Sequence, residues 1–113
     1  MKAIPYGKQN IDQEDIDAVV KVLKANFLTQ GPKVSEFEDK FAVYVGSKYA
    51  VAVNNATSGL HLSVLSLGLR EGDRVITTPI TFAASANCIR YVGGEAWFAD
   101  IDKDTYVLSL DST

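Results

Sequence analysis

A small polar cluster at residues 54–58 could bind an anion such as a phosphate. It stands between an apolar run, which predicts a strand, and a leucine-rich segment, which predicts a helix. A helix N-terminus presents unpaired N–H groups and a positive dipole end to anions. Ala56, Thr57 and Ser58 are small enough for close approach, and two hydroxyls can add hydrogen bonds. An ordinary helix cap by Asn55 or Thr57 gives the same pattern, and the local pattern alone favours that cap.

A second strand-to-helix turn, at residues 78–82, ends in an aromatic residue that could cover a flat ring. The carboxyl ends of neighbouring parallel strands lie at one edge of a sheet, where α/β proteins place their ligand sites. We therefore expect this turn and the first cluster to share an edge. Phe82 offers a flat apolar surface, although a phenylalanine at a helix start is more often part of the core.

Several other chemistries are weakened or excluded. No G-x-G-x-x-G fingerprint follows the first strand, which weakens a dinucleotide-binding (Rossmann) interpretation. One histidine and one cysteine exclude the common transition-metal sites, so no metal site is predicted. None of the eight lysines lies in a buried turn, and no catalytic nucleophile or general base is evident. His61 and Cys88 are interpreted as packing residues, whereas Asp100 and Asp102 could face a site or cap a turn.

Helix signals are strong at the start of the chain. Asp12 is a good N-cap with Asp15 at the N3 position, and Ile11 with Ile16 has the spacing of a hydrophobic staple. Together they predict an amphipathic helix over residues 13–25.

The elements that follow are delimited by proline and glycine. A second helix is predicted from Pro32 to Gly46, with an apolar face that we expect to be buried. After it, strand and helix patterns alternate. They predict a strand at 49–53, a largely buried helix at 57–67, a strand at 74–78, a buried helix at 82–91, a strand at 96–102 and a short strand at 106–108.

This alternation is typical of right-handed βαβ units on a parallel sheet. We therefore predict an α/β fold with a partial parallel or mixed sheet flanked by helices. The chain has 113 residues. About three parallel strands are few for a complete sheet, so we expect a piece of a longer protein.

Composition and charge exclude several kinds of partner. The net charge is −3 with no basic stripe, so we expect no binding to nucleic acid or to an anionic membrane. A single cysteine excludes an internal disulfide. No apolar stretch approaches the ~20 residues of a membrane span, and the N-terminus lacks the apolar core of a signal peptide. The expected location is the cytoplasm.

Several short motifs, spread over the chain in a fixed order, carry a combined signal. They are the segments 4–6, 28–32, 37–38, 52–60, 72–79, 81–87 and 98–102. Together they resemble the DegT/DnrJ/EryC1/StrS family of sugar-nucleotide aminotransferases, which are pyridoxal-phosphate (PLP) enzymes of fold type I. The likeness is closest to the enzymes that aminate a UDP-linked 4-keto-6-deoxy sugar on the pseudaminic acid route.

The resemblance implies roles for particular residues. Ala56, Thr57 and Ser58 match the turn that binds the phosphate of the cofactor, Phe82 matches the aromatic position on its pyridine ring, and Asn87 matches a position near the site. The positions that match the sugar-nucleotide pocket are Tyr6, Asn26, Phe27, Leu28 and Thr29.

The resemblance also implies an architecture. Residues 1–47 would form an N-terminal helical arm and residues 48–113 the start of the PLP-binding large domain, in a homodimer with a shared active site. Glutamate is the expected amino donor. The Schiff-base lysine and the aspartate that pairs with the pyridine nitrogen are expected beyond residue 113, so no catalytic residue is assigned and the chain alone should be inactive. A Rossmann-type oxidoreductase segment and a non-catalytic dimerisation module remain as alternatives.

Overall fold

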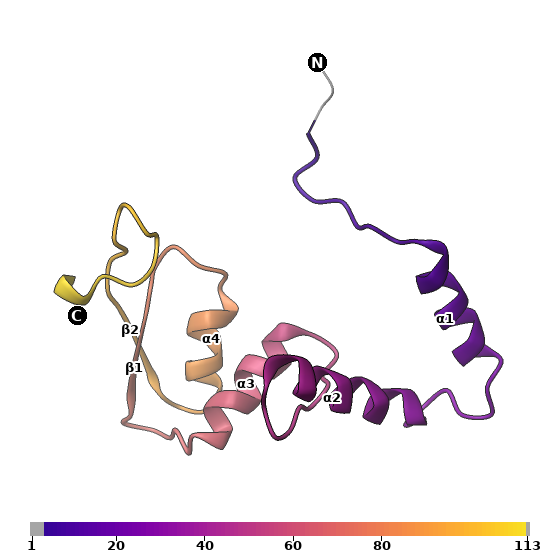
Figure 1. Ribbon diagram of the computed structural model, residues 1–113. Helices are drawn as coiled ribbons and strands as arrows, with labels where there is room; N and C mark the ends of the chain where they lie inside the picture. The colour runs from indigo at the N-terminus through magenta and orange to yellow at the C-terminus, as the bar shows by residue number, and fades with distance from the viewer. Residues whose placement is uncertain (1–3, 113) are drawn as a thin grey trace. The chain divides into compact units, whose positions relative to one another are not determined.

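The structure is a computed structural model that describes residues 4–112. The first three residues and Thr113, which complete the predicted domain ranges, lie outside the described residues. The chain divides into two compact units, one ending at Ala52 and the other beginning at Val53. We refer to them as the N-terminal unit and the C-terminal unit. Figure 1 colours the first from indigo to magenta and the second through orange to yellow.

In the N-terminal unit, helix α1 (Gln13–Leu23) begins at the predicted cap. Oδ1 of Asp12 accepts the N–H of Asp15 at 3.0 Å, and the N–H of Asp12 donates to Oδ2 of Asp15 at 3.1 Å. These two bonds form a capping box around the predicted N-cap. The helix ends two residues earlier than expected because the N–H of Ala25 bonds to the carbonyl of Val22, in the tighter turn common at helix ends.

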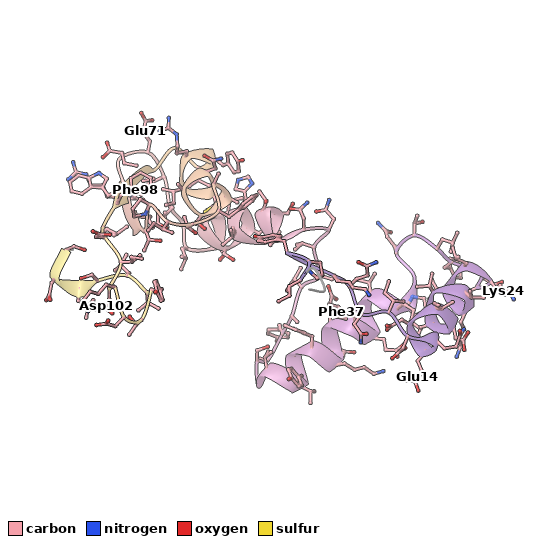
Figure 2. All side chains as sticks on the ribbon, turned by 90° about the horizontal axis from the view of Figure 1, so that it is seen from above. Glu14, Lys24, Phe37, Glu71, Phe98 and Asp102 are labelled. Carbon is pink, nitrogen blue, oxygen red and sulfur yellow. The ribbon has the colours of Figure 1, made fainter. Side chains whose placement is uncertain are left out.

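Proline and glycine delimit helix α2 (Pro32–Val45), also as predicted. Pro32 takes the first helical turn, where an N–H has no intrahelical partner. Gly46 ends the helix with a φ of 71°, a conformation that favours glycine. Figure 2 labels Phe37 on this helix, and its ring stacks on that of Phe41 with centroids 5.7 Å apart.

The prediction that α2 buries its apolar face is wrong. Val34, Phe37, Phe41 and Val45 are each about half exposed, and Ala42 is the one buried residue of this helix. The physical reason is that, within the described part of the N-terminal unit, no second element packs closely against the face. Amphipathic patterning indicates which face can be buried, and packing decides whether it is.

The predicted strand at residues 49–53 is also wrong, because this segment is irregular. A strand needs a neighbour for its N–H and C=O groups, and none of the described strands pairs with it. The N–H of Ala52 donates instead to Oε1 of Glu38, at 2.8 Å. This bond ties the segment back to α2.

The C-terminal unit is built on a parallel βαβ arrangement, visible in Figure 1. Strand β1 (Arg74–Thr77) and strand β2 (Glu95–Phe98) pair in parallel, with Arg74 opposite Glu95. Helix α4 (Ala84–Tyr91) connects them and contacts both, and helix α3 (Ala56–Ser66) packs on α4. The predicted α/β class is confirmed, although the described sheet has two strands.

A small core holds this unit together. Its buried side chains are Ala84, Cys88, Ile89 and Ala99, of which Ile89 is 1% exposed. Gly94 belongs to the same packing, since a Cβ there would come within 3.0 Å of the Ile89 side chain. The buried position of Cys88 agrees with its interpretation as a packing residue. Helix α4 therefore anchors the unit.

Helix α3 has the predicted position but not the predicted burial. None of its residues is buried, because α4 is the one described element that packs closely against it. The ring of His61 meets the edge of the Tyr91 ring, with centroids 5.3 Å apart, in agreement with a packing role. Gly68, expected as the C-cap, lies one residue beyond the observed cap, Leu67, with a φ of 74°.

The predicted strand at 96–102 is confirmed as β2 only as far as Phe98, and the predicted short strand at 106–108 is reduced to a single bridge. Strand β2 stops at Phe98, and Ile101 pairs with Leu108 in a single antiparallel bridge. A tight turn lies between them, with a φ of 59° at Tyr106. A short 3-10 helix, η1 (Leu110–Ser112), follows.

Candidate functional site

Asn55 caps helix α3 at the first predicted site. Its Oδ1 accepts the N–H of Ser58 at 2.9 Å. Oδ1 of Asn54 accepts both the hydroxyl of Ser58 and the side-chain amide of Asn55, each at 3.1 Å. The helix-cap interpretation is therefore right for Asn55. The single hydroxyl hydrogen of Ser58 is used within the chain.

The cap leaves other donors for an anion. Ala56 and Thr57 occupy the first two helical positions, whose N–H groups have no acceptor inside an α-helix. The first turn carries no acidic side chain that would repel an anion. The small, partly buried Thr57 can add its hydroxyl. These residues fit a phosphate ester, and the cap and phosphate interpretations are compatible.

Phe82 lies in the loop between β1 and α4, two residues before the helix begins. The residue is 78% exposed, so Phe82 is not part of the core of this unit, contrary to the alternative interpretation. Its carbonyl accepts the N–H of Ser85 at 2.9 Å. An exposed ring on a backbone fixed in this way can cover a flat ligand. Asn87 follows on α4, also exposed, with its N–H bonded to the carbonyl of Ala83 at 2.9 Å.

The two predicted ligand turns belong to the same unit, but they do not share a sheet edge. The loop of Phe82 directly follows the carboxyl end of β1, whereas residues 56–58 follow an irregular segment. The expected common edge is wrong, because it depended on a strand at 49–53 that has no partner. The packing of α3 on α4 connects the two helices instead.

The five residues predicted to contact the substrate all lie in the N-terminal unit. Tyr6 precedes α1 and is fully exposed, and the segment 26–29 forms an exposed loop between α1 and α2. This loop has a defined shape, since Gln30 adopts a φ of 52° and a Cβ on Gly31 would lie 2.8 Å from the carbonyl oxygen of Phe27. The predicted substrate-binding segment 26–29 is therefore an exposed loop with a constrained backbone.

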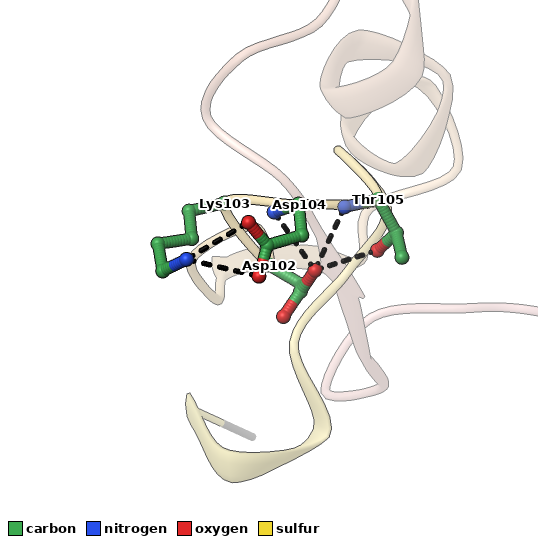
Figure 3. Close-up of polar contacts among 4 residues, drawn as sticks. All are labelled: Asp102, Lys103, Asp104 and Thr105. Carbon is green, nitrogen blue, oxygen red and sulfur yellow. Dashed lines mark hydrogen bonds and ion pairs between the residues drawn. The ribbon is translucent and has the colours of Figure 1, made fainter.

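The two aspartates at the end of the sheet cap backbone groups. Oδ1 of Asp102 accepts the N–H groups of Asp104 and Thr105, at 3.0 and 2.8 Å, and the Thr105 hydroxyl at 2.9 Å (Figure 3). The backbone bond from Thr105, with its hydroxyl and the Asp104 N–H, lowers the pKa of Asp102. Oδ1 of Asp100 accepts the N–H of Ile101 at 2.8 Å. Of the two interpretations, turn capping is the one observed.

Sequence reasoning missed two polar contacts that fix the candidate site. One is the bond from Ser58 to Asn54, and the other joins the hydroxyls of Thr81 and Ser85, 3.0 Å apart. Both pairs have i, i+4 spacing across a helix start, a signal that the sequence does contain. Over residues 4–112 no cluster of potential metal ligands is found, and no helix is long and apolar enough to cross a membrane.

Comparison with known proteins identifies the family of this chain. The sequence profile of the DegT/DnrJ/EryC1/StrS aminotransferase family matches residues 9–113. The chain is 50% identical over 101 residues to a UDP-4-amino-4,6-dideoxy-N-acetyl-beta-L-altrosamine transaminase of Campylobacter jejuni, covering 89% of this chain and 27% of the relative. It is 45% identical over 108 residues to the spore coat polysaccharide biosynthesis protein SpsC of Bacillus subtilis, covering 96% and 27%.

Solved structures lead to the same family. The PLP form of Spr1654 from Streptococcus pneumoniae, described as a sugar aminotransferase, matches with a TM-score of 0.89 and 33% identity, over 96% of this chain and 28% of that one. Its pyridoxamine-phosphate form matches with a TM-score of 0.90. The predicted cofactor is thereby confirmed for the family. The chain spans little more than a quarter of the length of these relatives. It belongs to the DegT/DnrJ/EryC1/StrS aminotransferase family.

Proposed function

We propose that this chain is part of a PLP-dependent aminotransferase that aminates a nucleotide-linked 4-keto-6-deoxy sugar. The observation that carries the proposal is the family match over residues 9–113, together with 50% identity to a transaminase whose name specifies a UDP-linked amino sugar. The UDP group, glutamate as amino donor, the pseudaminic acid route and a cytoplasmic location are parts of the same proposal.

The residues of the C-terminal unit would hold the cofactor. The N–H groups of Ala56 and Thr57 and the hydroxyl of Thr57 would bind its phosphate, with Ser58 holding the turn in shape through Asn54. Phe82 would cover one face of the pyridine ring, and Asn87 would lie nearby. When bound, PLP supplies the electron sink that amino transfer requires. The single phosphate also explains why no glycine-rich pyrophosphate fingerprint is needed.

The residues of the N-terminal unit would contact the sugar nucleotide. Tyr6 and the loop at 26–29 offer exposed aromatic and polar groups, which suit a nucleotide and a sugar. We propose that residues 1–47 act as a helical arm, that residues 48–113 begin the large domain, and that two subunits share each active site. The exposed apolar faces of α1 and α2 support this, because such faces are normally covered.

The reactive lysine belongs to the same proposal. Residues 49–102, which include all the proposed cofactor-binding residues, contain no lysine, so the 113-residue chain by itself should show no transaminase activity. The residue that holds the cofactor covalently would lie in the rest of the polypeptide. A parent reading frame without such a lysine would contradict transamination.

The test uses the full-length gene product. Purified protein is incubated with PLP, glutamate and a UDP-linked 4-keto-6-deoxy sugar, and the amino sugar is detected by mass spectrometry. We expect a mass change corresponding to replacement of the keto oxygen by an amino group, with 2-oxoglutarate formed in equal amount. Saturable binding of a nicotinamide cofactor, with no amino sugar formed, would favour the Rossmann-type oxidoreductase instead.

A further inference from the structure

The ring of Phe82 is directed by its backbone rather than by packing. It is 78% exposed, so the described residues cover little of it. Ala83, the N-cap of α4, contributes no side-chain cap. Something else must therefore fix the loop from which the ring projects.

Thr81 and Ser85 supply that constraint. Their hydroxyl oxygens lie 3.0 Å apart, so one hydroxyl donates to the other across the start of α4. The N–H of Ser85 also donates to the carbonyl of Phe82, at 2.9 Å. Two bonds from Ser85 thus fix the residues that carry the ring.

Ser85 is itself tied to the core of the unit. Its carbonyl accepts the thiol of Cys88 at 3.3 Å, and Cys88 is buried beside Ile89. Ala84, next to Ser85, is buried as well. The hydroxyl pair therefore links an exposed ring to the best-packed part of the C-terminal unit.

We propose that Thr81 and Ser85 form a positioning pair that holds Phe82 in place for the pyridine ring of PLP. The inference rests on the proposed function and adds two residues that contact Phe82 and its loop rather than the cofactor. Loss of the pair would let the loop move, so the cofactor would have to order it on binding. Affinity for PLP would fall while the fold of the unit remained.

The experiment compares variants of the full-length protein. Thr81→Val removes the hydroxyl at nearly constant volume, and Thr81→Ser keeps it. Thr78→Val is the matched control, because the Thr78 hydroxyl, in the same loop, makes only a long 3.4 Å contact with the carbonyl of Ile80. Each apo-protein is titrated with PLP, and the circular dichroism band of the bound cofactor and the melting temperature are recorded.

We expect Thr81→Val to weaken PLP binding about five- to tenfold, as loss of one hydrogen bond implies, and to change the dichroism band. Thr81→Ser should restore both, and Thr78→Val should leave both unchanged. In a Phe82→Ala background, Thr81→Val should have less than about a twofold effect on affinity, because residues that act through one another are not additive.

Two results would overturn this inference but leave the proposed function unaffected. One is equal affinity in Thr81→Val and Thr78→Val, and the other is an undiminished effect of Thr81→Val in the Phe82→Ala background. If Thr81→Val does not fold, Ser85→Ala removes the same bond from the other side and decides by the same criteria. Absence of PLP binding by the wild-type protein would overturn the proposed function and this inference with it.

Discussion

The N-terminal and C-terminal units differ in what forms their structure. Helices α1 and α2 begin and end at caps, proline and glycine that act within a few residues, and together they bury only Ala42. The C-terminal unit buries Ala84, Cys88, Ile89 and Ala99 between elements distant in sequence. Local signals are thus enough to form helices, whereas the unit that carries the candidate site depends on long-range packing.

Two isoleucines show the difference in burial between the units. Ile89 is 1% exposed in the C-terminal unit, and Ile16 on α1 is 47% exposed. In the isolated 113-residue chain, Ile89→Ala should destabilise the C-terminal unit by about 3 kcal/mol, because it leaves a cavity. Ile16→Ala should change stability by less than about 0.5 kcal/mol. Urea unfolding followed by circular dichroism compares them, and equal effects would contradict the contrast.

The two units also differ in the space around a glycine of each. A Cβ on Gly31 would lie 2.8 Å from the carbonyl oxygen of Phe27, whereas a Cβ on Gly59, inside α3, would meet Val53 at an ordinary 3.5 Å. Gly31→Ala should therefore destabilise the loop between α1 and α2 by about 1–3 kcal/mol.

Gly59→Ala should instead stabilise α3 by about 0.5–1 kcal/mol, since alanine favours a helix. The two variants are matched in chemistry and opposite in expected sign. Thermal melts of both, measured together, check the prediction. A shift of both melting temperatures in the same direction would be inconsistent with the observed packing.

The capping box of α1 tests whether contacts between near neighbours in sequence stabilise the N-terminal unit. Asp12→Ala removes the acceptor of the Asp15 N–H and so breaks the capping box. The change should destabilise α1 by about 1 kcal/mol, and the loss of helicity is measured by circular dichroism at 222 nm. Glu14→Gln is the control, because Glu14 lies in the same first turn without a role in the box. A similar loss of helicity in the control would mean that first-turn charge, rather than the cap, stabilises α1.

The smallest expected effects concern pH. Hydrogen bonds and charges from Lys33 and Lys40 lower the pKa of Glu36 from 4.5 to about 2. A lowered folded-state pKa means that the stabilising contribution is present above about pH 4.5 and is lost as pH falls toward 2. High salt should raise this pKa toward its usual value, because both partners are exposed lysines.

Asp102, in the C-terminal unit, is the comparison. Its pKa is lowered by hydrogen bonds from Thr105 and Asp104 rather than by a cation, so its contribution should also be lost on acidification but should resist salt. Carboxylate titrations by NMR at low and high salt distinguish the two. An equal response to salt at Glu36 and Asp102 would contradict these causes.

The same contrast explains how far the sequence could predict the structure. Asp12, Pro32, Gly46 and Asn55 act on their immediate neighbours, so their caps and turns could be read from the chain. The apolar run at 49–53 could not, because a strand requires a partner and none of the described strands provides one. Burial of α3 was overestimated for the same reason, as only α4 packs closely on it.

The candidate site was predictable to a similar extent. Residues 56–58 lie at a helix start, as expected from Asn55 and the leucines that follow. The exposure of Phe82 could not be predicted from the pattern, because a phenylalanine at a helix start is more often part of a core. The i, i+4 spacing of Ser58 with Asn54 and of Ser85 with Thr81 permits these hydrogen bonds, but whether they form depends on side-chain rotamers that the spacing does not specify.

Titration of the full-length apo-protein with PLP tests the central claim most directly. We predict saturable binding that weakens about tenfold in Phe82→Ala, since an aromatic contact adds roughly 0.5–1.5 kcal/mol beyond its buried area. Thr57→Val should weaken it as well, by removing a hydroxyl from the phosphate site. Absence of saturable binding, or binding unaffected by both substitutions, would contradict the account.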